Sequence, residues 1–127
     1  MAETRPDVEL RIPADSAYLS VLRTVTAGLA ARLDFTLDDI EDLRIAVDEA
    51  TAMVLPQTVP KSDLSCAFFL EVGRLGVSVT AICDSPRPPS QEGFAWTVLS
   101  ALTSSLDARV GENTLTVTLS RVSGVPA

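Results

Sequence analysis

The acidic side chains that could do chemistry are concentrated in residues 38–50 of one predicted helix. The acids of this stretch are Asp38, Asp39, Glu41, Asp42, Asp48 and Glu49. Asp34 comes just before them, and Arg44 is the only base among them. Acids near the start of a helix favour its positive end and are usually solvated. This interpretation is sufficient for the first four and predicts a solvent-facing helix surface there.

Asp48 and Glu49 need a different explanation, because they lie deep in the helix beside apolar Val47 and Ala50. Carboxylates at the border of an apolar face often serve a pocket. We therefore treat Asp48 and Glu49 as candidate site residues.

Several kinds of chemistry are excluded by composition. The chain has no histidine, which removes Ser-His-Asp and Cys-His catalysis and histidine-containing zinc sites. Its two cysteines cannot form a structural zinc site alone. Cys66 and Cys83 are expected to be small buried residues. They lie on two strands of a predicted hairpin, diagonal to each other if its loop is 73–74 and opposite if it is 74–75, so a redox switch is the lesser alternative.

The charge balance favours a protein partner. The net charge is −7 and no cluster of Lys and Arg is present, so direct binding to DNA or RNA is not expected. An acidic surface favours a basic protein. No apolar run is long enough for a membrane span, and residues 1–7 lack the apolar core of a signal peptide. We expect no membrane partner and a cytoplasmic location.

The elements that must position these side chains follow from the hydrophobic periodicity. The predicted order is strand, helix, helix, strand, strand, helix, strand, strand, over residues 8–13, 17–33, 36–54, 64–72, 75–83, 94–104, 108–110 and 114–122. Thr36 and Asp39 have capping-box spacing at the start of the second helix. The pattern predicts an α+β fold, a two-layer sandwich with three helices on one face of a mixed, mostly antiparallel sheet. One domain, 8–122, is expected between flexible ends, 1–7 and 123–127.

The stretch 38–50 resembles the second helix of the RsbW/SpoIIAB anti-sigma factor serine kinases. These belong to the superfamily of histidine kinases, gyrase and MutL (the GHKL or Bergerat ATP-binding fold). The predicted element order matches that fold from about Val8 to Val122. In the family this helix carries a glutamate, the general base, and four residues later a magnesium-binding asparagine. Glu49 matches the glutamate, but Met53 occupies the asparagine position, and a thioether is a poor ligand for Mg²⁺.

Two further nucleotide-binding motifs of the family are reduced to single residues. Asp84 matches the aspartate that holds the adenine, but Pro86 and Pro88 replace the glycines that follow it, and proline removes an N–H donor and fixes φ. Of the glycine-rich lid only Gly93 remains. The segment 94–102 resembles the actinobacterial branch typified by UsfX, in which these motifs are also eroded. We expect Met53, Phe94 and Trp96 to fill part of the former pocket, or simply to lie in the core, which suits Phe94 better.

Arg23 matches the arginine in the family's first helix that contacts both partner proteins. Its alternative role is an ordinary exposed charge.

The resemblance implies an anti-sigma factor that binds and sequesters an alternative RNA polymerase sigma factor. It also implies a homodimer and release by an anti-anti-sigma partner of the STAS type. No cofactor is expected. Two alternatives stay open. One is an active serine kinase that binds ATP and Mg²⁺ and phosphorylates its antagonist. The other is an unrelated two-layer interaction domain, in which Glu49 and Asp84 would not share a cleft.

Overall fold

The computed structural model describes residues 5–124 of the 127-residue chain. All eight predicted elements are present: β1 Val8–Pro13, α1 Leu19–Arg32, α2 Leu37–Val54, β2 Asp63–Glu71, β3 Arg74–Ile82, α3 Phe94–Leu102, β4 Ser105–Val110 and β5 Thr114–Val122. Short 3₁₀ turns, Ser16–Tyr18 and Leu55–Gln57, precede α1 and follow α2.

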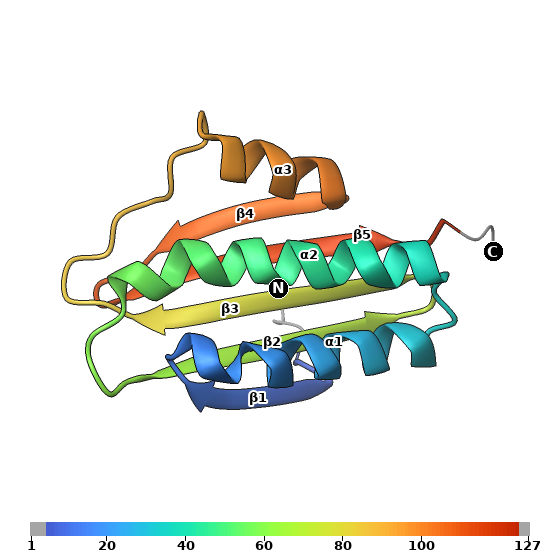
Figure 1. The fold of residues 1–127 in the computed structure, drawn as a ribbon, viewed down its shortest axis with the longest axis horizontal. Coiled ribbons are helices and arrows are strands. Elements are labelled where there is room, and N and C mark those ends of the chain that lie inside the picture. Colours follow the sequence, from blue (N-terminus) through green and yellow to red (C-terminus); the bar gives the residue numbers. More distant parts are fainter. Residues whose placement is uncertain (1–4, 125–127) are drawn as a thin grey trace.

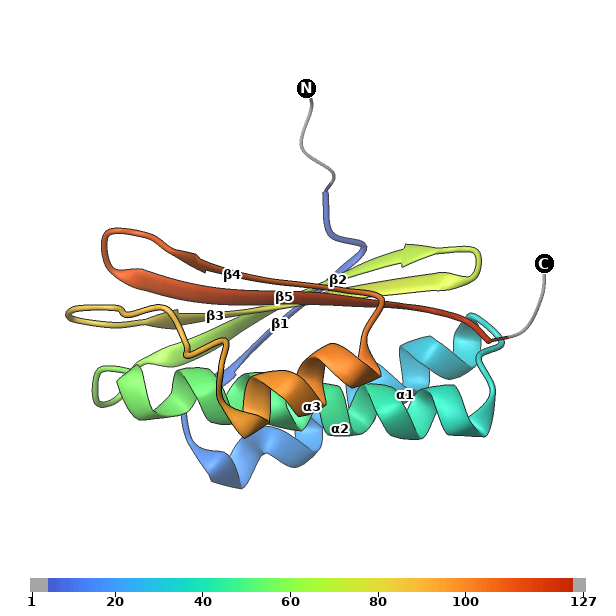
Figure 2. The same ribbon diagram turned by 90° about the horizontal axis from the view of Figure 1, so that it is seen from above.

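The elements form two layers, as predicted. Five strands make one sheet in the order β1-β2-β3-β5-β4, and all four pairings are antiparallel. The sheet is therefore entirely antiparallel, whereas a mixed, mostly antiparallel sheet was expected. All three helices lie on one face of this sheet (Figures 1 and 2). The α+β two-layer sandwich is confirmed, and the other sheet face is open.

The core lies between the helices and the sheet. Alternate residues of β2, β3 and β5 point into it, as the period of a strand requires, and those with no measurable exposure include Leu64, Phe68, Leu75, Val77, Val79, Leu115, Val117 and Leu119. Leu43, Ala50 and Val54 of α2 lie against them and are equally buried. Leu22 of α1 also belongs to this core, and Val25, Leu29 and Leu33, partly buried, pack against it.

The hairpin between β2 and β3 has a register that the sequence did not predict. Glu71 pairs with Arg74, so the loop is Val72-Gly73, and Gly73 adopts the φ of 77° that such a turn demands. Cys66 consequently lies opposite Val79. Both predicted cysteine pairings are therefore wrong, and Cys66 and Cys83 are free, buried thiols.

The ends of the other elements are set by local hydrogen bonds. The Asp15 side chain caps the 3₁₀ turn by accepting from Ala17 N–H at 2.9 Å. Thr36 caps α2 by accepting from Asp39 N–H at 3.1 Å, which confirms the predicted capping pair. The boundaries between α3 and β4 are corrected: α3 ends at Leu102 and not at 104, and β4 begins at Ser105 and not at 108.

The predicted flexible ends are only partly described. Asp7 N–H donates to Phe68 O at 2.8 Å, and Gly124 N–H donates to the Asp39 carboxylate at 2.9 Å. Residues 1–4 and 125–127 lie outside the described part of the chain.

Candidate functional site

Asp84 lies two residues after β3, at the start of the loop that leads to α3. It is exposed and lines a cavity of about 500 Å³ together with segments 56–60 and 85–87. Glu49 is not among the residues that line this cavity. This cavity is therefore not the cleft shared by Glu49 and Asp84 that we expect for a nucleotide site.

A pair of hydrogen bonds fixes the loop after Asp84 to the end of α2. The Gln57 side-chain amide donates to Arg87 O at 3.0 Å and accepts from Arg87 N–H at 2.9 Å. These two hydrogen bonds hold the proline-containing segment against the 3₁₀ turn. The sequence gives no signal for it, because any side-chain amide can pair with any free peptide group.

Glu49 and Met53 lie on the flank of α2 that faces α3. Asp42, on the same flank two turns earlier, contacts Arg121, and Arg121 donates to the Leu102 carbonyl at the end of α3. Residues seven and eleven positions after Asp42 return to that flank. Glu49 is half-buried, and Met53 packs against the core. This places the predicted general base and the methionine side by side between two helices.

Asp48 lies on the opposite flank, where it meets Arg23 of α1. Arg23 Nε lies 3.1 Å from Asp48 Oδ1, and the two side chains keep 38% and 42% of their exposure. The expectation that Asp48 serves a pocket is not met, since it forms an ion pair between α1 and α2. Arg23 stays partly accessible, so its predicted contact with a partner protein is sterically possible.

Asp39 is not a solvated acid, so the prediction for it is wrong. It is only 4% exposed. Its Oδ1 accepts from Arg121 Nη2 at 2.8 Å and Nε at 3.1 Å, and its Oδ2 accepts from Gly124 N–H and from the Thr36 hydroxyl, each at 2.9 Å. Burial alone would raise the pKa of Asp39, but these hydrogen bonds and the Arg121 charge outweigh burial and lower it.

At the start of α3, Phe94 does not fill a pocket as expected. Gly93 is the N-cap, with no side-chain cap. Phe94 is 84% exposed, so it neither fills a pocket nor belongs to the core, because its position in the first turn of α3 leaves it in solvent. Trp96 is half-buried.

The side chains at positions 49 and 53 do not form a donor set that suits Mg²⁺. Mg²⁺ needs hard oxygen ligands in octahedral geometry, and a core-packed thioether stands one turn after Glu49. Within residues 5–124, no group of three or more His, Cys, Asp or Glu side chains is placed to hold a metal ion. In the same range, no helix has both the length and the apolar character needed to cross a bilayer.

Comparison with known proteins gives two findings. Serine-protein kinases RsbW from Bacillus thuringiensis (strain Al Hakam) and from Bacillus cereus (strain Q1) are 33% identical to this chain over 81 residues. The matches cover 62% of this chain and 51% of those proteins. The chain thus spans about half the length of the curated relatives it matches.

The solved structure of the RsbU and RsbW domains of Rv1364c from Mycobacterium tuberculosis superposes with a TM-score of 0.73 and 21% identity. The superposition covers 96% of this chain and 34% of that one. No protein-family model matches the chain.

The fold and the α2 residues define an RsbW-like α+β sandwich. The matched sequences show that this chain is similar to RsbW serine-protein kinases over 81 residues, and the superposition shows that it has the fold of the solved RsbW domain.

Proposed function

We propose that this chain is an anti-sigma factor that binds and sequesters an alternative sigma factor of RNA polymerase and is released by an anti-anti-sigma protein of the STAS type. The proposal is supported by the similarity to RsbW serine-protein kinases in sequence and to a solved RsbW domain in fold. It includes a homodimer, a cytoplasmic location and control by partner competition without phosphoryl transfer.

The observation that carries the proposal is the side chain one turn after Glu49. Met53 packs against the core where a nucleotide-binding relative would need a magnesium ligand. The backbone after Asp84 supports the same conclusion, since Pro86 and Pro88 provide no N–H donors and Gln57 holds the intervening Arg87. Phosphoryl transfer depends on a positioned metal and positioned phosphates, whereas protein capture needs only the scaffold.

Charge supports a basic partner. The net charge of −7 favours rapid association with a positively charged surface, and sigma factors carry basic DNA-binding surfaces that an acidic protein can mask. Arg23 would act within this acidic surface. Its guanidinium is already paired with Asp48 at 3.1 Å, and a partner carboxylate could replace Asp48 because both side chains are accessible.

Affinity capture from the native cell at low salt tests the function, with the bound proteins identified. We expect a sigma factor, with less recovered at high salt because exposed charges are screened. Arg23→Ala should weaken the capture, and Arg32→Ala, which removes an exposed arginine of the same helix, should not. Recovery of no sigma factor under either condition would contradict the proposal.

The competing function is an active serine kinase, the activity for which the Bacillus relatives are named. Calorimetry with Mg-ATP separates the two functions. We expect no heat of binding, whereas micromolar affinity and transfer of phosphate to a STAS-type protein would establish the kinase. In that function Glu49 would be the general base and Asp84 the adenine ligand.

A further inference from the structure

The β4 edge of the sheet carries unpaired backbone groups. Gly111 N–H donates to Thr114 O at 2.8 Å, and the same register continues through the β4–β5 ladder. Because bonding alternates along an antiparallel ladder, the odd-numbered residues of β4 bond to β5. Leu106, Ala108 and Val110 therefore direct their N–H and C=O groups away from the sheet. An edge of this kind can accept another extended chain as a further strand.

Helix α3 projects over the space beside this edge. Viewed down the shortest axis, α3 lies beyond β4 on the outer side of the molecule (Figure 1), and the turned view places it in the helix layer on one side of the sheet (Figure 2). On the same side, Leu106 and Ala108 pack against the core, and Val110 is 40% exposed. A strand added beside β4 would therefore have α3 and apolar side chains over one face and solvent on the other.

Trp96 is the side chain of α3 that this arrangement leaves partly uncovered. Leu102 and Trp96 lie about 60° to either side of the fully buried Leu99. Leu102 packs against the core, whereas Trp96 belongs neither to the core of the described chain nor to the residues packed against it. The half-buried indole is therefore on the flank of α3 that extends over the β4 edge, where an added strand would cover it.

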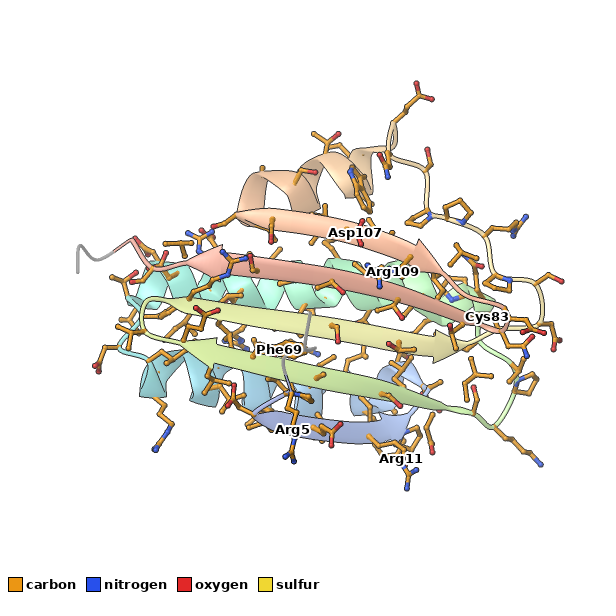
Figure 3. All side chains as sticks on the ribbon, turned by 180° about the vertical axis from the view of Figure 1, so that it is seen from behind. Arg5, Arg11, Phe69, Cys83, Asp107 and Arg109 are labelled. Carbon is orange, nitrogen blue, oxygen red and sulfur yellow. The ribbon has the colours of Figure 1, made fainter. Side chains whose placement is uncertain are left out.

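Two opposite charges lie on the other face of the same edge. Asp107 and Arg109 belong to the sheet face away from the helices (Figure 3), and both are exposed. Neither side chain forms an ion pair with another residue of the described chain. In a strand added antiparallel, the residues opposite them would be non-hydrogen-bonded pairs, whose Cα atoms approach to about 4.5 Å. The two charges therefore select the residues of the added strand.

We propose that the β4 edge and Trp96 form a docking site for an extended segment of another protein, which binds antiparallel to β4 as a sixth strand of the sheet. The segment has an acid opposite Arg109 and, two residues later, a base opposite Asp107. The residues between and beside these charges are apolar, because they face Trp96 and the helix layer. A slip by one residue would turn the charges toward the helix layer. The ligand is thus a strand-forming segment with the order apolar, acid, apolar, base, apolar.

The single tryptophan of the chain reports binding directly. The probe is a blocked peptide, Thr-Val-Glu-Val-Lys-Val-Thr, which contains no aromatic residue. Titration into the purified full chain should shift the Trp96 emission to shorter wavelength in a saturable way, because the peptide covers the indole. A control peptide with the charges exchanged, Thr-Val-Lys-Val-Glu-Val-Thr, should bind on the order of tenfold more weakly. No sigma factor is present, so the result is separate from the function proposed above.

Charge reversal in the protein tests the orientation of the segment. The double variant Asp107→Arg with Arg109→Asp changes only exposed side chains and should prefer the control peptide by a similar factor. The matched control is Glu9→Arg with Arg11→Glu on β1, at the other edge of the sheet, which should keep the wild-type preference. The absence of a saturable shift, equal affinity for the two peptides, or an unchanged preference in the β4 double variant would each overturn the proposal.

Hydrogen exchange locates the bound peptide along the edge. The amides of Leu106 and Ala108 should exchange more slowly when the peptide saturates the protein, because they then donate to its carbonyl groups. The amides of Asp107 and Arg109 bond to β5 and should be protected with and without the peptide. Protection gained on β1 instead would place the peptide at the opposite edge and overturn the proposal.

A second copy of the chain is the competing occupant of this edge. On β1, Glu9 and Arg11 have the same order of charges, and pairing β1 with β4 of another copy would produce open-ended assemblies. Ala108→Pro removes an N–H that points outward, which an edge strand tolerates. It should abolish the response to the peptide and leave the circular dichroism and the mass by light scattering unchanged. A mass that grows with concentration in the wild type and falls in Ala108→Pro would make a second copy the occupant and overturn the proposal.

Discussion

Arg121 and Asp39 form a largely buried ion pair that joins three elements. The side chains are 19% and 5% exposed, and Arg121 also reaches Asp42 on α2 at 2.9 Å and the Leu102 carbonyl of α3 at 2.8 Å. Together these contacts fix the start of α2, the end of α3 and the end of β5. A buried charge that loses its partner is costly, because the remaining charge cannot be solvated.

Arg121→Ala should therefore lower the free energy of unfolding by about 3 kcal/mol. Urea unfolding followed by circular dichroism measures it. The matched control is Arg44→Ala, which removes a pair with Glu41 at 3.5 Å whose side chains are 41% and 62% exposed. The control should cost less than about 1 kcal/mol. Equal losses in the two variants would show that the Arg121 network contributes no more than a surface pair.

The same pair makes stability depend on pH. The pKa of Asp39 is lowered from 3.8 in the folded chain, because its hydrogen bonds and the Arg121 charge outweigh burial. The unfolded chain therefore takes up a proton first as the pH falls. The stabilisation from this ion pair is fully present above the pKa that Asp39 has in the unfolded chain. It is lost as the pH falls through the lower pKa that Asp39 has in the folded chain. The difference in unfolding free energy between wild type and Asp39→Asn should narrow below about pH 4. A constant difference from neutral to acid pH would contradict this linkage.

The sequence predicted the neighbours of Asp39 along the chain but not across it. Its capping pair with Thr36 follows from a spacing of three. Its partner Arg121 lies 82 residues away, and nothing in either residue's local pattern links the two. A single acid in an acidic helix stretch therefore looks solvated until the sheet brings β5 beneath the start of α2.

Among the elements, α1 is destabilised by a glycine in its interior, Gly28. A Cβ added there would meet no atom within 4 Å, and glycine inside a helix costs backbone entropy. Gly28→Ala should stabilise the chain by about 0.5–1 kcal/mol, measured by thermal unfolding. Gly73→Ala is the contrasting variant, because its φ of 77° strains any other residue, and it should destabilise the chain. A destabilising Gly28→Ala would mean that this helix face already contacts a second molecule.

The loop between β3 and α3 depends on Gln57. Gln57→Ala removes both hydrogen bonds to Arg87, so the Arg87 amide should exchange with solvent roughly fivefold faster, the equivalent of about one net hydrogen bond. Gln91→Ala, at an exposed position of the same loop, is the control and should leave the rate unchanged. Unaltered exchange in Gln57→Ala would show that the prolines alone hold the loop.

Element types were easier to predict than element boundaries and registers. The apolar period along α2 and the alternation in β5 reproduce the observed helix and strand, because burial of one face is encoded every few residues. The β2–β3 register differs from both predicted registers because the loop is Val72-Gly73. The sequence could not decide this, since Gly73 can adopt a positive φ at either position of a two-residue loop. Phe94 was misplaced because its hydrophobicity predicts burial, whereas its position at the first turn of α3 leaves it in solvent.

For the whole molecule, the sequence predicted the layer architecture and the resemblance to RsbW proteins, because both depend on element order and on one helix motif. It could not predict how the candidate site is divided. Asp84 lines a cavity with residues 56–60, Glu49 lies on the α3 flank of α2, and Asp48 pairs with Arg23 on the other flank. Residues adjacent on a helix point in directions about 100° apart, so neighbours in the motif serve different surfaces.

The two cysteines provide probes of how this molecule opens. Both side chains are 2% exposed, and burial raises the pKa of Cys66 to about 11. Burial also raises the pKa of Cys83, the Asp84 charge acts in the same direction, and a hydrogen bond with the Leu115 backbone opposes both. Reaction with an aromatic disulfide reagent requires an accessible thiolate. Labelling at neutral pH should therefore require unfolding.

If the sheet opens as one unit, Cys66 of β2 and Cys83 at the end of β3 should be labelled at the same rate, and that rate should rise with urea in step with global unfolding. Quantifying each labelled peptide by mass spectrometry gives the two rates. Cys83 adjoins the loop that Gln57 holds, so faster labelling of Cys83 alone would show that this end of the sheet opens separately. Gln57→Ala decides the cause: it should accelerate Cys83 and leave Cys66 unchanged if loop release exposes the thiol, and it should change neither rate if global unfolding is required.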